Sequence, residues 1–324
     1  MSINNKNILV TGGAGFIGSH LVDRLIRDGA SRVVIIDNMF LGNEENLKSA
    51  IDDQGAILYK DDAEILTSLE YIIEKHNIDI VFNCATKALN YSFVNPRNAC
   101  DTNVTVILNL LELQRKHAFV KLCHFSSSEV YGSAEYEPMD EAHPMHPTTT
   151  YAAGKAAADI VLESYVRMFG LDAVIVRPFN NYGPRQNYLG PLAGVIPQTV
   201  RRILKNSPPE IHGTGDQSRD FIFVTDTVNA VLKVMDKLNP AESVNIAVAK
   251  QLSIRELIGK IADIMNYHGE IVYKESRPSD VACHEGSNEK IKSLIDFHLT
   301  PFEEGLRQTI SWYRSIFEKL GPNI

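Results

Sequence analysis

Cysteine and tryptophan are scarce in this chain, whose 324 residues include four cysteines and one tryptophan. The cysteines, Cys84, Cys100, Cys123 and Cys283, form no C-x-x-C pair and no spacing typical of a metal site. This pattern excludes a small disulfide-stapled fold and a zinc module. Two of the four lie in apolar, strand-like runs, where a free thiol behaves as a small hydrophobic side chain. We therefore expect no metal ion, and a reducing, cytoplasmic setting.

The chain also lacks long apolar runs and an excess of positive charge. No run approaches the ~18 apolar residues of a membrane span, and the N-terminal segment MSINNKNILVTGG has too short an apolar stretch for a signal peptide. The formal net charge is −8, whereas an extended nucleic-acid footprint needs a basic surface. We expect neither a membrane nor a nucleic acid as partner.

Short β-branched runs alternate with helix-patterned segments in the first half of the chain. These runs are almost continuously apolar, which is typical of strands covered by helices on both faces of a parallel sheet. The sequence therefore predicts an α/β fold with a doubly wound parallel sheet. The expected strands are residues 7–10, 32–37, 79–83, 121–125 and 173–179.

The sequence pattern changes after Pro178, where a turn-rich segment precedes shorter helical and strand patterns. Helices are expected in VIPQTVRRILK, SIRELIGKIADIMN and PFEEGLRQTISWYRSIF. We interpret this part as a smaller C-terminal α/β substrate domain, laid over the ends of the sheet strands, where ligands bind in such folds. The predicted larger domain comprises residues 1–180 with 221–250, and the smaller one residues 181–220 with 251–324.

Gly12, Gly15 and Gly18 follow the first expected strand in G-x-x-G-x-x-G spacing and open a helix. Glycines let such a turn approach a pyrophosphate closely, and the helix N-terminus supplies N–H donors and a favourable dipole. The next strand ends in Asp37, whose carboxylate can accept from adenosine ribose hydroxyls and would repel a 2′-phosphate. We predict a bound dinucleotide, NAD rather than NADP; the alternative is that Asp37 caps a helix.

Tyr151 and Lys155 share one face near the start of a predicted helix, because residues i and i+4 are helix neighbours. A cation beside a phenol stabilises the phenolate and lowers the tyrosine pKa toward the range of a general base. Tyr71 and Lys75 have the same spacing, and we interpret them as a pair on a helix surface. Tyr151 differs because a strand ending in the run SSSE precedes it by about two dozen residues.

The chain resembles the extended short-chain dehydrogenase/reductases that act on nucleotide sugars. The resemblance covers almost the whole length and rests on TGGAGFIGSH, SSSEVYG, YAAGK, RPFNNYGPRQ, GTGDQSRDFIFVTD and RPSD. It implies a Rossmann-like fold, NAD as the cofactor and a nucleotide-diphosphate hexose as the substrate.

The resemblance assigns the first chemical step to three side chains. It implies that Tyr151 takes a proton from the sugar 4-hydroxyl while hydride leaves C4 for the nicotinamide, and that Ser127 bonds the sugar 4-oxygen. It implies that Lys155 holds the nicotinamide ribose and depresses the pKa of the Tyr151 phenol. Asn103 matches a family asparagine with a mainly structural role.

The resemblance also implies which residues bind NAD. The Asp61–Asp62 pair falls where family members contact the adenine, although KDDAEI departs from the common Gly-Asp-x-Arg-Asp form. The full expected set is Gly12, Gly15, Phe16, Ile17, Gly18, Asp37, Asn38, Asp61, Asp62, Ala85, Thr86 and Lys155.

For the substrate, Asn180, Arg219 and Arg277 match family residues that bind the nucleotide diphosphate, and arginine forks suit phosphate geometry. The alternatives are a turn-forming role for Asn180 and an ion pair of Arg219 with a neighbouring aspartate. Val195, in VIPQ, is expected to line the base pocket. Lys87 either holds a sugar carboxylate or faces solvent. Arg185 is interpreted as a surface residue near the site.

Glu129 stands where simple 4-epimerases of the family commonly have a small or neutral residue. Its presence resembles the branches that remove the C5 proton of a 4-keto intermediate, such as nucleotide-sugar 4,6-dehydratases. Ser128 occupies the position of an aspartate in the dTDP-glucose type, but GDP-mannose 4,6-dehydratases also have hydroxyl-Ser-Glu. We predict a 4,6-dehydratase with Ser127, Ser128, Glu129, Tyr151 and Lys155 as catalytic residues. UDP-glucuronate decarboxylation, 4-epimerisation and a non-catalytic NAD-sensing scaffold remain alternatives.

The segments 98–117 and 151–169 are rich in apolar and small residues. Family members commonly dimerise by packing this helix pair into a four-helix bundle. We expect a homodimer through these helices; the alternative is that both faces only cover the sheet of one subunit.

Overall fold

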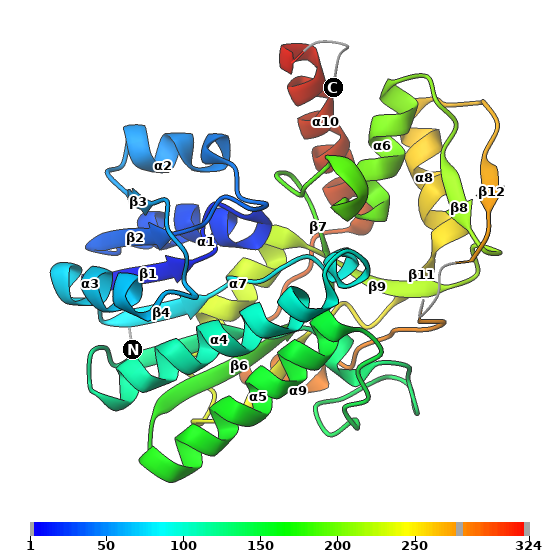
Figure 1. Ribbon diagram of the computed structural model, residues 1–324. Helices are drawn as coiled ribbons and strands as arrows, with labels where there is room; N and C mark the ends of the chain where they lie inside the picture. Colours follow the sequence, from blue (N-terminus) through cyan, green and yellow to red (C-terminus); the bar gives the residue numbers. More distant parts are fainter. Residues whose placement is uncertain (1–2, 277–280, 321–324) are drawn as a thin grey trace.

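A seven-stranded sheet forms the centre of the molecule (Figure 1), and its computed structural model describes residues 3–276 and 281–320. The strand order is β10-β6-β5-β4-β1-β2-β3, and all neighbours are parallel. The predicted doubly wound parallel sheet is confirmed. Its strands are β1 Asn7–Thr11, β2 Arg32–Ile36, β3 Ile57–Tyr59, β4 Ile80–Asn83, β5 Lys121–Phe125, β6 Asp172–Pro178 and β10 Ser243–Ile246.

Side chains of the sheet alternate between two apolar layers, as the period of a strand requires. In β1, Ile8 and Val10 face a layer that includes residues of α1 and α7, whereas Leu9 faces a layer that includes residues of α3, α4 and α5. Both faces are therefore covered, which explains why the strands are apolar without alternation. The helices named here are α1 Phe16–Arg27, α3 Leu66–His76, α4 Pro96–Arg115, α5 Thr150–Phe169 and α7 Val224–Val234.

The termini of α5 are fixed by local signals in the sequence. The Thr149 side chain accepts a hydrogen bond from the backbone N–H of Ala152, and Gly170 ends the helix in the left-handed conformation. Since Thr149 fixes where the helix begins, it also fixes the position of Tyr151 in the first turn. α4 and α5 pack side by side along the lower face of the sheet in Figure 1.

A smaller assembly lies at the upper right of Figure 1. Its elements are β7 Asn180–Tyr182, β8 Glu210–His212, β9 Ser218–Phe223, β11 Gln251–Ser253, β12 Val272–Lys274, α6 Val195–Leu204, α8 Ile254–Met265 and α10 Phe302–Leu320. α6, α8 and α10 share one apolar core with Tyr182 and Phe223. The three helices expected in this half of the sequence are confirmed. The side chains Ser253 and Glu256 form a capping box that begins α8.

The chain returns to the large sheet before its last helix. α9 (Glu289–Leu294) lies beside β10, and the side chains of Ile291, Phe297 and Leu299 pack in the layer of α1 and α7. The remaining short helix of that face is α2 (Lys48–Asp52). The division into two domains by residue range stays a prediction.

Candidate active site

A cavity of about 400 Å³ opens at the carboxyl ends of the sheet strands. The strand order reverses there, between β1 and β4, and open α/β sheets bind ligands at such a point. The cavity is lined by most of the predicted site residues. They are Gly12, Gly15, Phe16, Ile17, Gly18, Asp37, Asn38, Asp62, Ala85, Thr86, Lys87, Ser127, Ser128, Glu129, Tyr151, Lys155 and Asn180.

The glycine turn between β1 and α1 has no room for side chains. Gly12 has a φ of +66°, and a Cβ at Gly18 would lie 2.3 Å from the carbonyl oxygen of Gly12. Among the described residues, no side chain caps the N-terminus of α1 at Gly15. The first N–H groups of α1 are thus available to an anion, and the helix dipole favours negative charge at this end.

Asp37 ends the β2 segment and holds the glycine turn. Its carboxylate accepts hydrogen bonds from the backbone N–H groups of Ala14 and Met39, both at 2.9 Å. Burial raises the pKa of Asp37, and these amides partly offset the increase. Gly42 leaves space for the carboxylate, because a Cβ there would lie 2.5 Å from an Asp37 oxygen. Asp37 is therefore more than a helix cap; it lies on the cavity wall beside the turn.

The two aspartates expected near the adenine are placed differently. Asp62 lies on the cavity wall and accepts a hydrogen bond from the side-chain amide of Asn38 at 2.8 Å. Asp61 lies outside the residues that line the cavity, and its carboxylate accepts from the backbone N–H of Asp62. With the glycine turn and Asp37, this wall fits a dinucleotide with free ribose hydroxyls.

Tyr151 is the centre of the catalytic group. Its hydroxyl is hydrogen-bonded to the hydroxyls of Ser127 and Thr86, and burial raises the pKa of the phenol to about 12. The contacts that lower this pKa come from Ser127 and Thr86. The sequence predicted that Lys155 lowers the pKa of Tyr151. In the protein alone the pKa is raised overall, because burial outweighs the contacts that lower it. Asn103, which accepts a hydrogen bond from Thr86 at 2.7 Å, holds that threonine in place.

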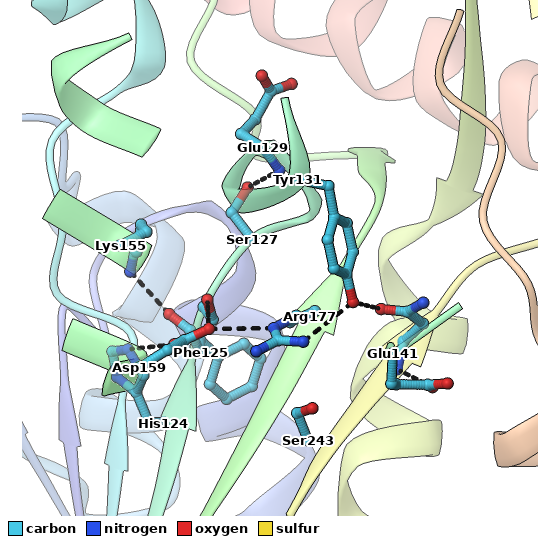
Figure 2. Close-up of polar contacts among 12 residues, drawn as sticks. His124, Phe125, Ser127, Glu129, Tyr131, Glu141, Lys155, Asp159, Arg177 and Ser243 are labelled. Carbon is cyan, nitrogen blue, oxygen red and sulfur yellow. Dashed lines mark hydrogen bonds and ion pairs between the residues drawn. The ribbon is translucent and has the colours of Figure 1, made fainter. Parts of the chain in front are cut away.

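Lys155 lies one turn beyond Tyr151 and is buried. Its Nζ donates to the backbone carbonyl of Phe125 at 2.7 Å (Figure 2). Burial lowers the pKa of Lys155 to about 8, while Asp159 and Cys84 oppose the decrease. The ammonium therefore remains mostly protonated near neutral pH, in the place where the family resemblance puts the nicotinamide ribose.

Glu129 lies in a short 3-10 helix, η3 (Ser128–Tyr131), that follows β5. Its backbone N–H donates to the Ser127 hydroxyl at 3.2 Å. Figure 2 shows its carboxylate pointing away from the buried group around Asp159. It is near enough to Tyr151 that its charge raises the pKa of the phenol. Ser128 is buried, and its backbone carbonyl is hydrogen-bonded to the imidazole of His284 at 3.2 Å.

A second cavity, of about 380 Å³, adjoins the first. It contains the predicted residues Val195 and Arg219, and it shares Glu129 and Asn180 with the first cavity. The Arg219 guanidinium donates to the backbone carbonyls of Ser218 and Val281 at 2.8 and 2.6 Å, which orients it along the wall. Arg277 lies outside the residues that the structure describes.

The two aspartates suggested as partners of Arg219 are engaged elsewhere. Asp216 forms an ion pair with Arg255 at 3.1 Å. Asp220 accepts from the backbone N–H groups of Val248 and Ala249, and burial raises its pKa to about 6.

Lys87 and Arg185 both lie on the first cavity. Lys87 is buried, which corrects the alternative that it faces solvent, and its Nζ lies 4.4 Å from the ring centroid of Phe40. Arg185, interpreted as a surface residue near the site, lines the cavity and is partly exposed. Its guanidinium pairs with Asp23 of α1 at 2.7 Å and is partly buried. Tyr71 and Lys75, by contrast, form an exposed hydrogen-bonded pair at 2.8 Å, as predicted.

Sequence reasoning missed several residues of the second cavity. These side chains come from segments that are separated in the chain and carry no motif, so only the fold brings them together. They are Thr199, Arg202, Glu210 and His212. Within the described ranges, no three His, Cys, Asp or Glu side chains are grouped as a metal site requires, and no helix is long and apolar enough to span a bilayer.

Comparisons with known proteins agree with this geometry. Residues 8–247 match the model of the NAD dependent epimerase/dehydratase family. A putative UDP-glucose 4-epimerase of Methanocaldococcus jannaschii is 34% identical over 95% of this chain and 98% of its own length. UDP-glucuronic acid decarboxylase 1 of Xenopus tropicalis is 30% identical over 99% of this chain and 75% of its own length. The crystal structure of DesIV, a dTDP-glucose 4,6-dehydratase of Streptomyces venezuelae with NAD bound, has a TM-score of 0.91 and 28% identity, covering 97% of this chain and 98% of that one.

The chain belongs to the NAD-dependent epimerase/dehydratase family, which confirms the resemblance drawn from its motifs. It is an NAD-dependent enzyme that modifies nucleotide sugars, and the predicted cofactor is thereby confirmed. The three relatives are named for different reactions at similar identity, so the particular reaction must be argued from the residues of the site.

Proposed function

We propose that the protein is a nucleotide-sugar 4,6-dehydratase that converts a nucleotide-diphosphate hexose to its 4-keto-6-deoxy derivative. NAD supplies the redox chemistry when bound, by accepting hydride from C4 of the sugar and returning it to C6. The residues of the chain move the protons. Tyr151 removes the proton of the 4-hydroxyl, and Ser127 holds the 4-oxygen. These roles agree with the hydrogen bond between the two hydroxyls in the cavity.

Glu129 carries the step that distinguishes a dehydratase. Once C4 is a ketone, the C5–H bond is acidic, and a carboxylate beside C5 can remove that proton. The C6–O bond then breaks as the C5–C6 double bond forms, and the departing hydroxide takes a proton to leave as water. We assign that proton to Glu129, which has just received one from C5, since Ser128 replaces the aspartate of the dTDP-glucose type. The 4-keto-6-deoxy product forms when C6 receives the hydride and C5 receives a proton from solvent.

The observation that supports this proposal most directly is the location of Glu129 on both cavities. The first cavity contains the glycine turn and the second contains Arg219, and we therefore assign the carboxylate shared by both to the junction of cofactor and sugar. Its charge also acts on the Tyr151 phenol. A 4-epimerase needs only Tyr151, Ser127 and room for the sugar to turn over. Decarboxylation of a sugar acid calls for a further cation at the sugar, and Lys87, which lines the first cavity with Tyr151, is the candidate for that role.

Product mass tests the proposal. The purified enzyme with NAD is incubated with UDP-, GDP- and dTDP-hexoses and with UDP-glucuronate, and the products are analysed by mass spectrometry. We expect one hexose to lose one water. Loss of carbon dioxide from UDP-glucuronate would identify a decarboxylase, and unchanged mass with inverted C4 would identify an epimerase. No conversion of any sugar, with NAD bound, would support the non-catalytic sensor.

We also propose a homodimer through α4 and α5, and a cytoplasmic location. On α5, Ile160 and Met168 are 58% and 68% exposed and lie two turns apart on one face. Burying such side chains against a second copy is favourable by ~25 cal/mol per Å² of apolar surface. Light scattering should give twice the mass of the chain, and Ile160→Glu should reduce it to one chain. A monomeric wild-type protein at assay concentration would reject the dimer.

A further inference from the structure

Three side chains of α5, each one turn from the next, hold three consecutive residues at the end of β5. Residues at i, i+4 and i+8 lie along one helix face, so the three contacts form a ladder between the helix and the strand. Figure 2 shows the contact between Lys155 and Phe125. The pairs are Tyr151 with the Ser127 hydroxyl, Lys155 with the Phe125 carbonyl at 2.7 Å, and Asp159 with the Ser126 hydroxyl at 2.8 Å.

Asp159 is the one member of this ladder to which the proposed mechanism gives no role. Its carboxylate is 0% exposed, and its Oδ2 accepts from Ser126 and from the Arg177 Nε at 3.0 Å. Arg177 is also buried, and its NH1 donates to the Tyr131 hydroxyl. Among the described residues, no donor lies within hydrogen-bond distance of the other oxygen, Oδ1. A buried carboxylate that leaves one oxygen without a hydrogen bond is costly, and therefore calls for an explanation.

The imidazole nearest to that oxygen is neutral. His124 Nε2 lies 3.7 Å from Asp159 Oδ1, and burial lowers the pKa of His124 well below its usual value. The Asn83 side chain accepts from the Thr11 hydroxyl and donates to His124 Nδ1, so the imidazole proton is on Nε2. Burial raises the pKa of Asp159, and Arg177, the Ser126 hydroxyl and Lys155 oppose the increase. Held by these contacts, Asp159 is the carboxylate that faces the two cations of this buried cluster, Lys155 and Arg177.

We propose that Asp159 is a positioning residue for the catalytic pair, which balances the buried charge of Lys155 and fixes the β5 end that carries Ser127. It acts through Lys155 and Ser126 rather than on the sugar or the cofactor. The proposal holds whichever reaction of the family the enzyme catalyses, because it concerns the charge and the alignment of groups that serve the first hydride transfer.

The groups that face Lys155 come from each element around it. They are Asp159 on α5, Cys84 after β4 and His124 on β5, and Arg177 on β6 is connected to them through Asp159. Asp159 is the largest contribution that raises the pKa of Lys155, which is about 8 with the carboxylate in place. A neighbouring opposite charge commonly shifts a pKa by ~1–3 units. Without Asp159, Lys155 would lose its proton below or near neutral pH.

Asp159→Asn tests the charge, and Ser126→Ala serves as the matched control. The asparagine keeps the shape of the side chain and an acceptor for Ser126 but removes the charge, whereas the control removes the hydrogen bond and keeps the charge. The pKa of Lys155 is measured by NMR of lysine labelled at Cε and Nζ, with the signal assigned by its loss in Lys155→Met. This measurement needs neither the cofactor nor a known substrate, so its failure is distinct from a failure of the proposed dehydratase activity.

We expect the pKa of Lys155 to fall by ~1 unit or more in Asp159→Asn and to stay unchanged in Ser126→Ala. The rate of NADH formation should fall as rising pH removes the proton of Lys155, and in Asp159→Asn this fall should occur at a lower pH than in the wild type. An unchanged Lys155 pKa in folded Asp159→Asn would overturn the proposal, and so would an equal shift in both variants. If Asp159→Asn does not fold because Arg177 is left unpaired, the double variant Asp159→Asn/Arg177→Met restores neutrality of that pair. It should still show the lowered Lys155 pKa, and a wild-type value there would also overturn the proposal.

Discussion

The glycine turn gives a prediction whose size follows from one distance. A Cβ at Gly18 would lie 2.3 Å from the Gly12 carbonyl oxygen, about 1 Å short of the 3.4 Å at which ordinary contacts begin. Gly18→Ala must therefore move the turn against the start of α1 by ~1 Å. A hydrogen bond of ~2.9 Å does not survive such a displacement. One hydrogen bond to a charged group is worth ~1.5–3 kcal/mol, which corresponds to ~10–100-fold weaker NAD binding.

Isothermal titration of the purified variant with NAD measures this loss, and circular dichroism at the same temperature shows whether the variant is folded. Gly259→Ala is the matched control, because Gly259 lies within α8 and a Cβ there would meet no atom within 4 Å. That variant should bind NAD as the wild type does and be ~1 kcal/mol more stable. A folded Gly18→Ala protein with wild-type NAD affinity would refute the placement of the pyrophosphate at this turn.

Further predictions concern the catalytic group, the second cavity and a buried histidine. Tyr151→Phe should lower kcat by ~10²–10⁴ with little change in NAD affinity; a loss below tenfold would exclude a general-base role. Arg219→Met should raise the KM for the nucleotide sugar more than it lowers kcat. An unchanged KM in steady-state kinetics would contradict this prediction. Burial lowers the pKa of His284 from 6.5 to about 3, so the unfolded chain binds a proton that the folded one excludes as pH falls below 6.5. Stability is thus lost toward acid pH, by ~1.4 kcal/mol per unit for this group, and urea unfolding of His284→Gln should show a shallower loss between pH 7 and 5.

The sequence predicted the long elements of the larger sheet because their apolar runs are covered on both faces. β1, β2, β4, β5 and β6 lie where the runs are, with bounds that differ by at most one residue at either end. β3, of three half-buried residues, and β10, of four residues, were not recognised as strands. Both lie at the edges of the sheet and are short, and so few residues give no clear apolar pattern.

Site residues carried by motifs were predictable, and those defined by packing were not. The glycine turn, Asp37 and the Tyr151–Lys155 pair each depend on spacing within one segment, which the sequence displays. The contacts of Arg185 and Lys87 could not be predicted, because they depend on α1 and on Phe40, which lie far from them in the chain. The pKa of Tyr151 was misjudged for the same reason, since the amount of burial cannot be read from an i, i+4 spacing.

Asp159 shows why a charge partner is hard to recognise from the sequence. In YAAGKAAADIVLE it is one acidic residue on a helix that also contains Glu163, and spacing does not separate the two. Only the fold shows that Asp159 is buried beside Ser126 and Arg177, while Glu163 pairs with Arg167 at the surface. Buried charges of this kind are determined by contacts between α5, β5 and β6.

The most direct test of the central claim is the fate of the C5 proton in Glu129→Gln. The wild-type enzyme and the variant are each mixed with NAD and the accepted hexose substrate in deuterated water, and NADH absorbance and deuterium at C5 are followed together. The variant should form NADH at close to the wild-type initial rate, accumulate it, and incorporate no deuterium at C5, because oxidation needs Tyr151 and elimination needs Glu129. Full turnover with normal deuterium incorporation by the variant would contradict the role of Glu129 and, with it, the assignment as a dehydratase.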